Sequence, residues 1–181
     1  MQMHPSLQIQ SMIKALTDVV LPAVDPANKL AQEQARLVVG TLNLMAQQLP
    51  LRFRFDCDEL SRLLQLADVL RKAAQGGAGT AACVERMGRA ATAASRALEQ
   101  AQAGPDAIGQ AIRDLRAVTS QVVRSAYVEC EGAALKRVEG AVLASSKEQL
   151  LRDRSWVLAQ GWEPDPEAVP KIRNLLEARP G

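Results

Sequence analysis

Few residues of this chain have the types and spacing that enzyme chemistry requires. There is one histidine, His4, and there are three cysteines, Cys57, Cys83 and Cys130. A cysteine nucleophile needs a base nearby, and a Ser-His-Asp triad or a zinc site needs histidines that converge with other groups. His4 lies near the amino terminus, and no such group is close to it in sequence. We therefore expect no catalytic residues, no metal site and no cofactor.

Glu129 is the acidic residue whose position stands out. It follows Val122 and Ala126 on one apolar helical stripe, where a buried carboxyl group would titrate above its usual range. Small residues dominate the apolar face of the helix expected from about residue 80 to residue 102, and this could leave a cavity between helices. One hypothesis is thus a pocket for an apolar ligand with one charged end, formed by Cys83, Met87, Glu129, Cys130 and Arg137. The alternative is a half-buried Glu129 that pairs with an arginine of another helix.

Two further patterns could suggest a phosphate-binding loop or a nucleic-acid partner, and we expect neither. The segment 76–80 reads GGAGT, which lacks the Gly-Lys-Ser/Thr ending of a phosphate-binding loop and follows no predicted strand, so we interpret it as a flexible connection between helices. The 22 basic and 20 acidic residues leave a net charge of +2. The basic residues form small clusters with acids close by, and we therefore expect no nucleic-acid partner.

Large apolar residues gather near the carboxyl end of the sequence. Trp156 and Trp162 flank Gly161, and an apolar helical pattern follows at Val169, Ile172, Leu175 and Leu176. Tryptophan is enriched in interface hot spots, and a short apolar helix needs a groove that its own chain or a second subunit supplies. These six residues are the candidate interface, with a second copy of the chain or another protein as the partner.

The elements that carry these residues are predicted to be helices. Apolar residues make up 48% of the 181 residues, and 30 Ala and 23 Leu give a helical composition. Three- and four-residue apolar spacing predicts a helix over residues 6–21 that ends at Pro22, and a second over 26–48 with Asp25 as its N-cap. Residues 51–55 are expected to form a loop in which Phe53 or Phe55 plugs the core.

Further helices are expected along the rest of the chain. Asp56 and Glu59 have the spacing of a capping box and predict the start of a third helix, which ends at Gly76-Gly77. A fourth helix is expected over about 80–102, a long fifth over 106–144 and a sixth over 146–160, with a kink near Gly132 or Gly140 as the alternative to that division. Gly161 ends the sixth helix, and a last short helix follows the prolines.

Together these patterns predict an all-α protein, an antiparallel bundle of four to five long helices with a C-terminal helical arm. The bundle domain is expected over 1–161, and a Pro-containing linker and arm over 162–181. The absence of a signal-peptide pattern and of long apolar runs predicts a cytoplasmic protein without a membrane partner. The predicted function is non-enzymatic, a self-associating scaffold or accessory protein that acts through protein–protein contact; the alternative is a small-molecule-binding bundle.

Overall fold

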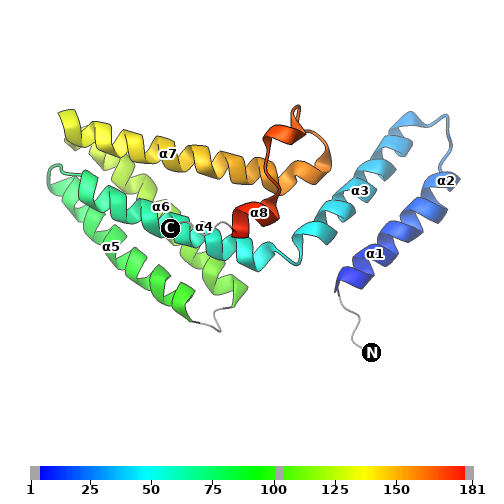
Figure 1. Cartoon of the computed structure of the whole chain (residues 1–181), viewed down its shortest axis with the longest axis horizontal. Helices are drawn as coiled ribbons and strands as arrows, with labels where there is room; N and C mark the ends of the chain where they lie inside the picture. Colours follow the sequence, from blue (N-terminus) through cyan, green and yellow to red (C-terminus); the bar gives the residue numbers. More distant parts are fainter. Residues whose placement is uncertain (1–4, 101–103, 178–181) are drawn as a thin grey trace. The chain divides into compact units, whose positions relative to one another are not determined.

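The computed structural model describes residues 5–100 and 104–177, and every regular element in these ranges is helical, which confirms the all-α prediction. His4 and the predicted helix end at Gln102 lie outside the described residues. The elements along the chain are α1 (Pro5–Ala15), the π-helical η1 (Leu16–Val20), α2 (Leu21–Ala23), α3 (Lys29–Gln48), α4 (Arg52–Ala73), α5 (Ala78–Glu99), α6 (Pro105–Glu129), α7 (Gly132–Val157), the 3-10 turns η2 (Leu158–Gln160) and η3 (Pro166–Ala168), and α8 (Ile172–Glu177) (Figure 1).

The described chain divides into two compact units. The first joins the residues up to Arg52 to the segment Arg152–Glu177, and the second is Phe53–Leu151. In the first unit α1 packs antiparallel to α3, and α3 also contacts η2 (Figure 1). The first unit therefore brings together two segments that lie far apart in the sequence. The domain boundary expected at residue 161 stays a prediction.

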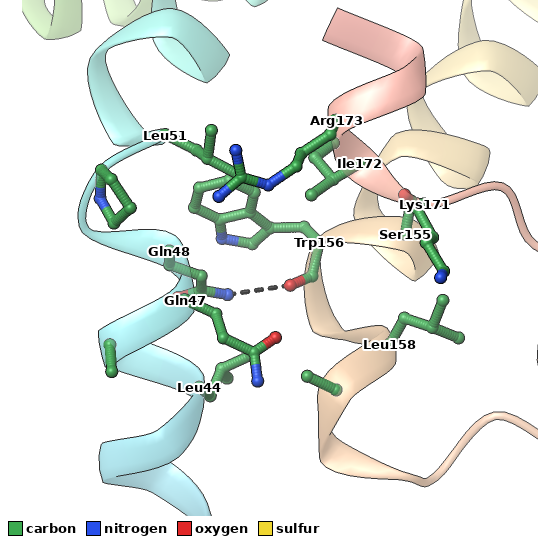
Figure 2. A pocket seen from close by; sticks show the side chains of 13 residues that line it. Leu44, Gln47, Gln48, Leu51, Ser155, Trp156, Leu158, Lys171, Ile172 and Arg173 are labelled. Carbon is green, nitrogen blue, oxygen red and sulfur yellow. Dashed lines mark hydrogen bonds between the residues drawn. The ribbon is translucent and has the colours of Figure 1, made fainter. Parts of the chain in front are cut away.

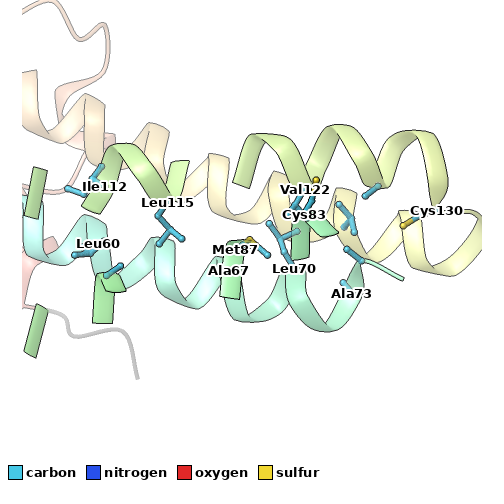
Figure 3. Packing of buried hydrophobic residues seen from close by; sticks show 14 of the residues in the cluster. Leu60, Ala67, Leu70, Ala73, Cys83, Met87, Ile112, Leu115, Val122 and Cys130 are labelled. Atoms are coloured by element: carbon cyan, nitrogen blue, oxygen red, sulfur yellow. The ribbon is translucent and has the colours of Figure 1, made fainter. Parts of the chain in front are cut away.

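The second unit is a bundle of α4, α5, α6 and most of α7, in which each helix runs antiparallel to the one before it (Figure 1). Its core is aliphatic, with many small side chains that allow helices to approach closely. Figure 3 shows these side chains along the bundle. The core residues that are at most 2% exposed are Leu60, Ala67, Leu70, Met87, Ala94, Ile108, Leu115, Val122, Ala126 and Val138.

Ion pairs join helices of the bundle at its surface. Arg62 of α4 donates to Glu148 of α7 over 2.9 Å and to Asp58 of its own helix over 3.0 Å. Arg116 of α6 pairs with Glu59 of α4, whose side chain is almost fully buried. The cost of removing these charges from water offsets much of their attraction, so we assign most of the free energy of folding to the apolar core.

The first helix does not end at Pro22 as predicted. Proline lacks an N–H and its ring clashes with the carbonyl four residues earlier in an α-helix. The π-helical turn Leu16–Val20 ends two residues before Pro22, and helical backbone then continues to Ala23. A wider turn at this point removes the clash, because π-helical bonds join residues five apart.

The predicted N-cap of the second helix is also wrong. Asp25 accepts a hydrogen bond from the Ala27 N–H over 2.9 Å, which is a local turn before the helix. Asn28 is the N-cap of α3, and its side chain accepts from the Ala31 N–H over 3.0 Å. Both residue types favour turns and caps, so composition alone does not decide between them.

Residues 52–55 are helical, which corrects the predicted loop at 51–55. Because α4 begins at Arg52, Asp56 and Glu59 lie inside the helix and form no capping box at its start. Phe55 is buried and Phe53 is exposed, so the expectation that one of the two fills the core holds for Phe55. The alternating pattern of these residues suits a strand and one helical turn equally well over so short a stretch.

The long segment after residue 105 breaks near Gly132 and not near residue 145. Cys130 is the C-cap of α6, and Gly132 begins α7 with a φ of +54°, a conformation that favours glycine. The predicted capping box at Ser145 and Glu148 lies inside α7. The break thus occurs at the first of the two glycines that the alternative prediction named. Gly161, with a φ of +74°, ends the helical run at η2 as predicted.

Candidate functional site

A groove of about 470 Å³ lies in the first unit, between the end of α3, the end of α7 and the α8 segment. We call it the Trp156 groove, because the indole of Trp156 lies between the α3 side and the α8 side in Figure 2. The groove is mostly apolar, with two amides and two cations. Its lining residues are Leu44, Ala46, Gln47, Gln48, Pro50, Leu51, Ser155, Trp156, Leu158, Ala159, Lys171, Ile172 and Arg173.

Hydrogen bonds fix the walls of the Trp156 groove. Gln48 of α3 donates from Nε2 to the Trp156 carbonyl oxygen over 2.9 Å, which ties α3 to the end of α7 (Figure 2). Ser155, which is buried, donates from Oγ to the Pro170 carbonyl oxygen over 2.6 Å. This second bond holds the chain immediately before Lys171 against α7. The groove is therefore formed by segments that are tied to one another before any ligand arrives.

The turn at Gly161 is braced by a bidentate ion pair. Arg154 donates from Nε and Nη2 to the two carboxylate oxygens of Glu163 over 2.9 and 2.7 Å. The hydrogen bonds from Arg154 lower the pKa of Glu163, and those to Glu163 raise the pKa of Arg154. Fork-to-fork geometry of this kind fixes orientation as well as charge. It returns the chain from α7 toward the groove.

The charge of the Trp156 groove is one-sided. Lys171 and Arg173 flank Ile172 at the start of α8, and both cations are exposed. No described residue that lines the groove is acidic. Among the described residues, neither cation has an ion-pair partner. The groove thus combines an apolar interior with a positive rim.

The first unit also carries an exposed apolar surface on α3. We call it the α3 face and define it by Leu30, Leu37, Val38, Met45 and Leu49, all of which are at least 44% exposed. Their spacing places them on one side of the helix. The half-buried apolar residues of α3 form an adjacent row at positions 31, 35, 39, 42 and 46. The helix is therefore apolar on two sides, of which one is exposed.

The pocket expected within the bundle corresponds to none of the cavities that we describe. Cys83, Met87 and Cys130 are buried in the core of the second unit, and Met87 is fully inaccessible. Arg137 lies in another place, over a surface hollow that it lines with Val69 and neighbouring residues of α4 and α7. The structure thus gathers the first three residues into packed core and leaves Arg137 apart from them.

Glu129 caps a helix to which it does not belong. Its Oε2 accepts from the Thr80 backbone N–H over 2.6 Å, at the amino-terminal end of α5. The hydrogen bonds from Thr80, and a further one from the Gly79 backbone, lower the pKa of Glu129 although partial burial opposes this. This direction is opposite to the one expected for a buried carboxyl group. Neither of the two sequence interpretations of Glu129, a pocket or an arginine pair, included this contact.

The glycines of segment 76–80 allow the approach of Glu129. A Cβ atom at Gly79 would clash with Glu129 Oε1, and one at Gly77 would lie 3.1 Å from Oε2. A Cβ at Gly76 would lie 2.7 Å from the Thr80 hydroxyl and 3.1 Å from the Cys130 sulfur. The segment that the sequence marks as a flexible connection is closely packed around a carboxylate of this chain. The acid at a helix amino terminus is favoured by the unpaired N–H groups there.

The six predicted interface residues lie in three kinds of environment. Trp156 and Ile172 line the groove, and both are half-buried. Trp162 is 73% exposed and lines a neighbouring hollow of about 410 Å³ with residues of α3 that include Leu37. Val169 is buried within its own chain, and Leu175 and Leu176 are half-buried.

Sequence reasoning missed the two cations of the groove and the extent of the α3 face. Lys171 and Arg173 flank Ile172, and basic residues beside an interface candidate were a signal that could have been used. Sequence periodicity shows that a helix is apolar, but it does not show which of two apolar sides a neighbour covers.

Three findings in the described parts of the chain concern metal, thiol and membrane chemistry. No group of three or more His, Cys, Asp or Glu residues there has metal-binding geometry. Burial, aided by the charge of Asp56, raises the pKa of the Cys57 thiol, which disfavours its nucleophilic form. Among the described helices, none combines the length and the apolar character that a membrane span requires.

In the residues that the structure describes, the chain is all-α and forms two compact helical units, the first of which has an apolar groove with a basic rim. We compared the chain with family models, curated proteins and solved structures, and nothing matched it. Its function must therefore be argued from its own surfaces.

Proposed function

We propose that this protein acts through protein–protein contact, as a self-associating scaffold or accessory protein without catalytic activity, and that the α3 face is the contact surface. A second copy of the chain is the proposed partner. Three cysteines without disulfide partners suit a reducing compartment, and the proposal includes an intracellular location. The observation that carries the proposal is the exposure of five large apolar residues, four on α3 and one, Leu49, at its C-cap.

The exposure of these residues is unusual for one side of a helix that packs against its neighbours through another side. Leu30 is 68% exposed and Leu37 is 50% exposed, and three further residues of the same face are similarly open. Single exposed apolar residues are normal, but several on one side of a helix mark a candidate interaction surface, here with the exposed polar residues Gln34 and Thr41 between them. The face contains no charged residue, and charged residues are depleted at the centres of interfaces.

The antiparallel arrangement of α1 and α3 extends the α3 face onto a second helix. In α3, the exposed residues precede the half-buried row by about 90° around the helix axis, at 100° per residue. Met12 of α1, which is exposed, precedes the buried Ile9 and the half-buried Ile13 by about 80° on average in the same sense. In an antiparallel pair, similar offsets in the same sense fall on one side. Met12 is thus added to the surface that α3 presents.

The size of this surface suits a dimer of modest stability. A helix of 20 residues such as α3 is about 30 Å long and about 10 Å wide, so two helices offer roughly 600 Å². Two copies that pack through this surface would bury roughly 1,200 Å² in total, the lower limit for stable protein interfaces. A homodimer in exchange with monomer at micromolar concentration is the expected state.

Charged substitutions on the α3 face test the proposal. Leu37→Glu combined with Met45→Glu places two carboxylates in the centre of the surface, and like charges from two copies would then repel. The proposal expects a dimer for the wild-type chain and a monomer for this variant, measured by size-exclusion chromatography with light scattering. Circular dichroism checks that the variant remains helical.

Leu143→Glu combined with Leu150→Glu is the matched control. These leucines lie on α7, outside the first unit, and they are as exposed as those of the α3 face. The control adds the same charge at two exposed apolar positions and should leave the dimer intact. Dissociation by the control variant and not by the α3 variant would place the contact surface elsewhere and contradict the proposal.

A further inference from the structure

We propose that the Trp156 groove binds a small amphiphile, an apolar chain that carries one anionic headgroup, with Lys171 and Arg173 at the headgroup. The proposal does not depend on self-association. It concerns a cavity that is separate from the α3 face, and a different observation carries it. That observation is an apolar groove with two cations and no acidic residue among its described lining residues.

The charge at the rim selects an anion. Lys171 and Arg173 are separated by one residue at the start of α8, and the exposed ammonium and guanidinium groups have no ion-pair partner among the described residues. Arg154, by contrast, is already occupied by both carboxylate oxygens of Glu163. A guanidinium and an ammonium together give charge-assisted hydrogen bonds to a carboxylate or phosphate. A cationic ligand would be repelled at the same place.

The interior of the groove selects an apolar body. Leu44, Leu51 and Leu158 line it together with Ile172 and the indole of Trp156 (Figure 2). A volume of about 470 Å³ falls in the range of small-molecule sites. The amides of Gln47 and Gln48 are the other polar side chains of α3 there, and Gln48 is engaged with the Trp156 carbonyl. One charged end and one apolar end of a ligand are therefore matched separately.

The groove requires little rearrangement before binding. Gln48 holds α3 to the end of α7, and Ser155 holds the chain before Lys171. Preformed walls reduce the entropic cost of ordering the protein when a ligand binds. The two cations, which are exposed, keep the freedom to close on a headgroup.

Fluorescence of Trp156 gives a direct measurement of occupancy. The substitution Trp162→Phe leaves Trp156 as the only tryptophan, and Trp162 is not a lining residue of the groove. The probes are decanoate, decyl phosphate and decyltrimethylammonium, each below its critical micelle concentration. We expect saturable changes in Trp156 emission with decanoate or decyl phosphate and none with decyltrimethylammonium. Equal binding of the cationic probe, or no binding of either anion, would overturn the proposal.

Removal of the rim charges tests the role of the cations. Lys171→Gln combined with Arg173→Gln should weaken binding of the anion about tenfold or more, because charge-assisted hydrogen bonds are lost. Lys136→Gln combined with Lys147→Gln removes the same net charge from exposed positions on α7 and should leave affinity unchanged. Equal losses of affinity in both variants would show that net charge alone governs binding, and would overturn the placement of the headgroup at Lys171 and Arg173.

A variant that fills the groove tests the apolar part without a change of charge. Ala159→Leu adds three carbon atoms to an exposed lining position on η2 and should abolish the saturable signal, while circular dichroism remains that of the wild type. Leu37→Glu, on the α3 face, should retain binding. Loss of binding in Leu37→Glu but not in Ala159→Leu would assign the amphiphile to the α3 face and overturn the site.

Discussion

Glu129 shows how one side chain can stabilise a helix from a distance in sequence. It accepts the Thr80 N–H of α5 from the end of α6, and the hydrogen bonds lower the pKa of its carboxyl group. A group whose pKa is lower in the folded state stabilises the protein above its unfolded pKa of about 4.3. That stabilisation is lost as the pH falls through the pKa of the folded state.

The first prediction concerns the pH dependence that Glu129 contributes. Glu129→Gln should melt at a lower temperature than the wild type at pH 7, because a neutral amide interacts less favourably with the N–H groups of α5. The difference should shrink as the pH is lowered through the acid range, where the wild-type carboxyl group becomes protonated. Glu139→Gln, at an exposed position of α7, is the control. A gap that stays constant from neutral to acid pH would contradict the capping role.

The second prediction uses two glycines in helices. A Cβ atom at Gly140 meets nothing within 4 Å, so Gly140→Ala should raise the free energy of unfolding by up to about 1 kcal/mol through helix propensity. A Cβ atom at Gly79 clashes with Glu129 Oε1, and overpacking of this kind costs about 1–3 kcal/mol. Gly79→Ala should therefore lower the free energy of unfolding in urea titrations. Equal gains in both variants would show that Glu129 is not held against the loop.

At the scale of helices, apolar spacing predicts where helices lie better than where they begin. The helical character of 29–48, 78–99 and most of 105–157 follows from three- and four-residue spacing. The starts at Asn28 and Arg52 were missed because residues of cap type also occur nearby, at Asp25 and Asp56. A cap depends on the φ and ψ of its own residue, which sequence spacing does not encode. The glycine-rich segment 76–80 shows the limit of sequence spacing most clearly. Its close packing depends on the contact with Glu129, which lies 49 residues from Thr80.

The third prediction compares two methionines, Met87 and Met45, which both belong to apolar helical patterns in the sequence but differ in burial. Met87 of α5 is fully buried in the bundle, and Met87→Ala should lower the free energy of unfolding by about 2–5 kcal/mol. Met45 of α3 is 48% exposed. Met45→Ala should change unfolding at low protein concentration by about 0.5 kcal/mol or less, as is usual for surface positions. Urea denaturation of both variants gives the comparison, and similar losses would contradict the assignment of Met45 to an open face.

At the scale of the whole molecule, the sequence predicted the all-α fold class but not the division of the chain into two compact units. The residues up to Arg52 and those from Arg152 belong to one unit, and long-range contacts of this kind leave no periodic signal. The candidate interface at the carboxyl end was partly informative, since Trp156 and Ile172 line the groove. Lys171 and Arg173 are recognisable as groove residues only because the fold places α3 beside them, and the sequence does not predict that contact.

The two proposals for the molecule rest on different surfaces of the first unit. The α3 face would bind a second copy of the chain, and the Trp156 groove would bind an amphiphilic anion. Variants on one surface should leave the other process intact, because the α3 face and the lining of the groove share no residue. Failure of either proposal is thus distinguishable from failure of the other.

The measurement that tests the central claim most directly is sedimentation equilibrium of the wild-type chain over a range of micromolar concentrations, beside Leu37→Glu with Met45→Glu. The account predicts a monomer–dimer equilibrium for the wild type and a single 19.5 kDa species for the variant. A wild-type chain that stays monomeric at every concentration, or a variant that still forms the dimer, would contradict self-association through the α3 face.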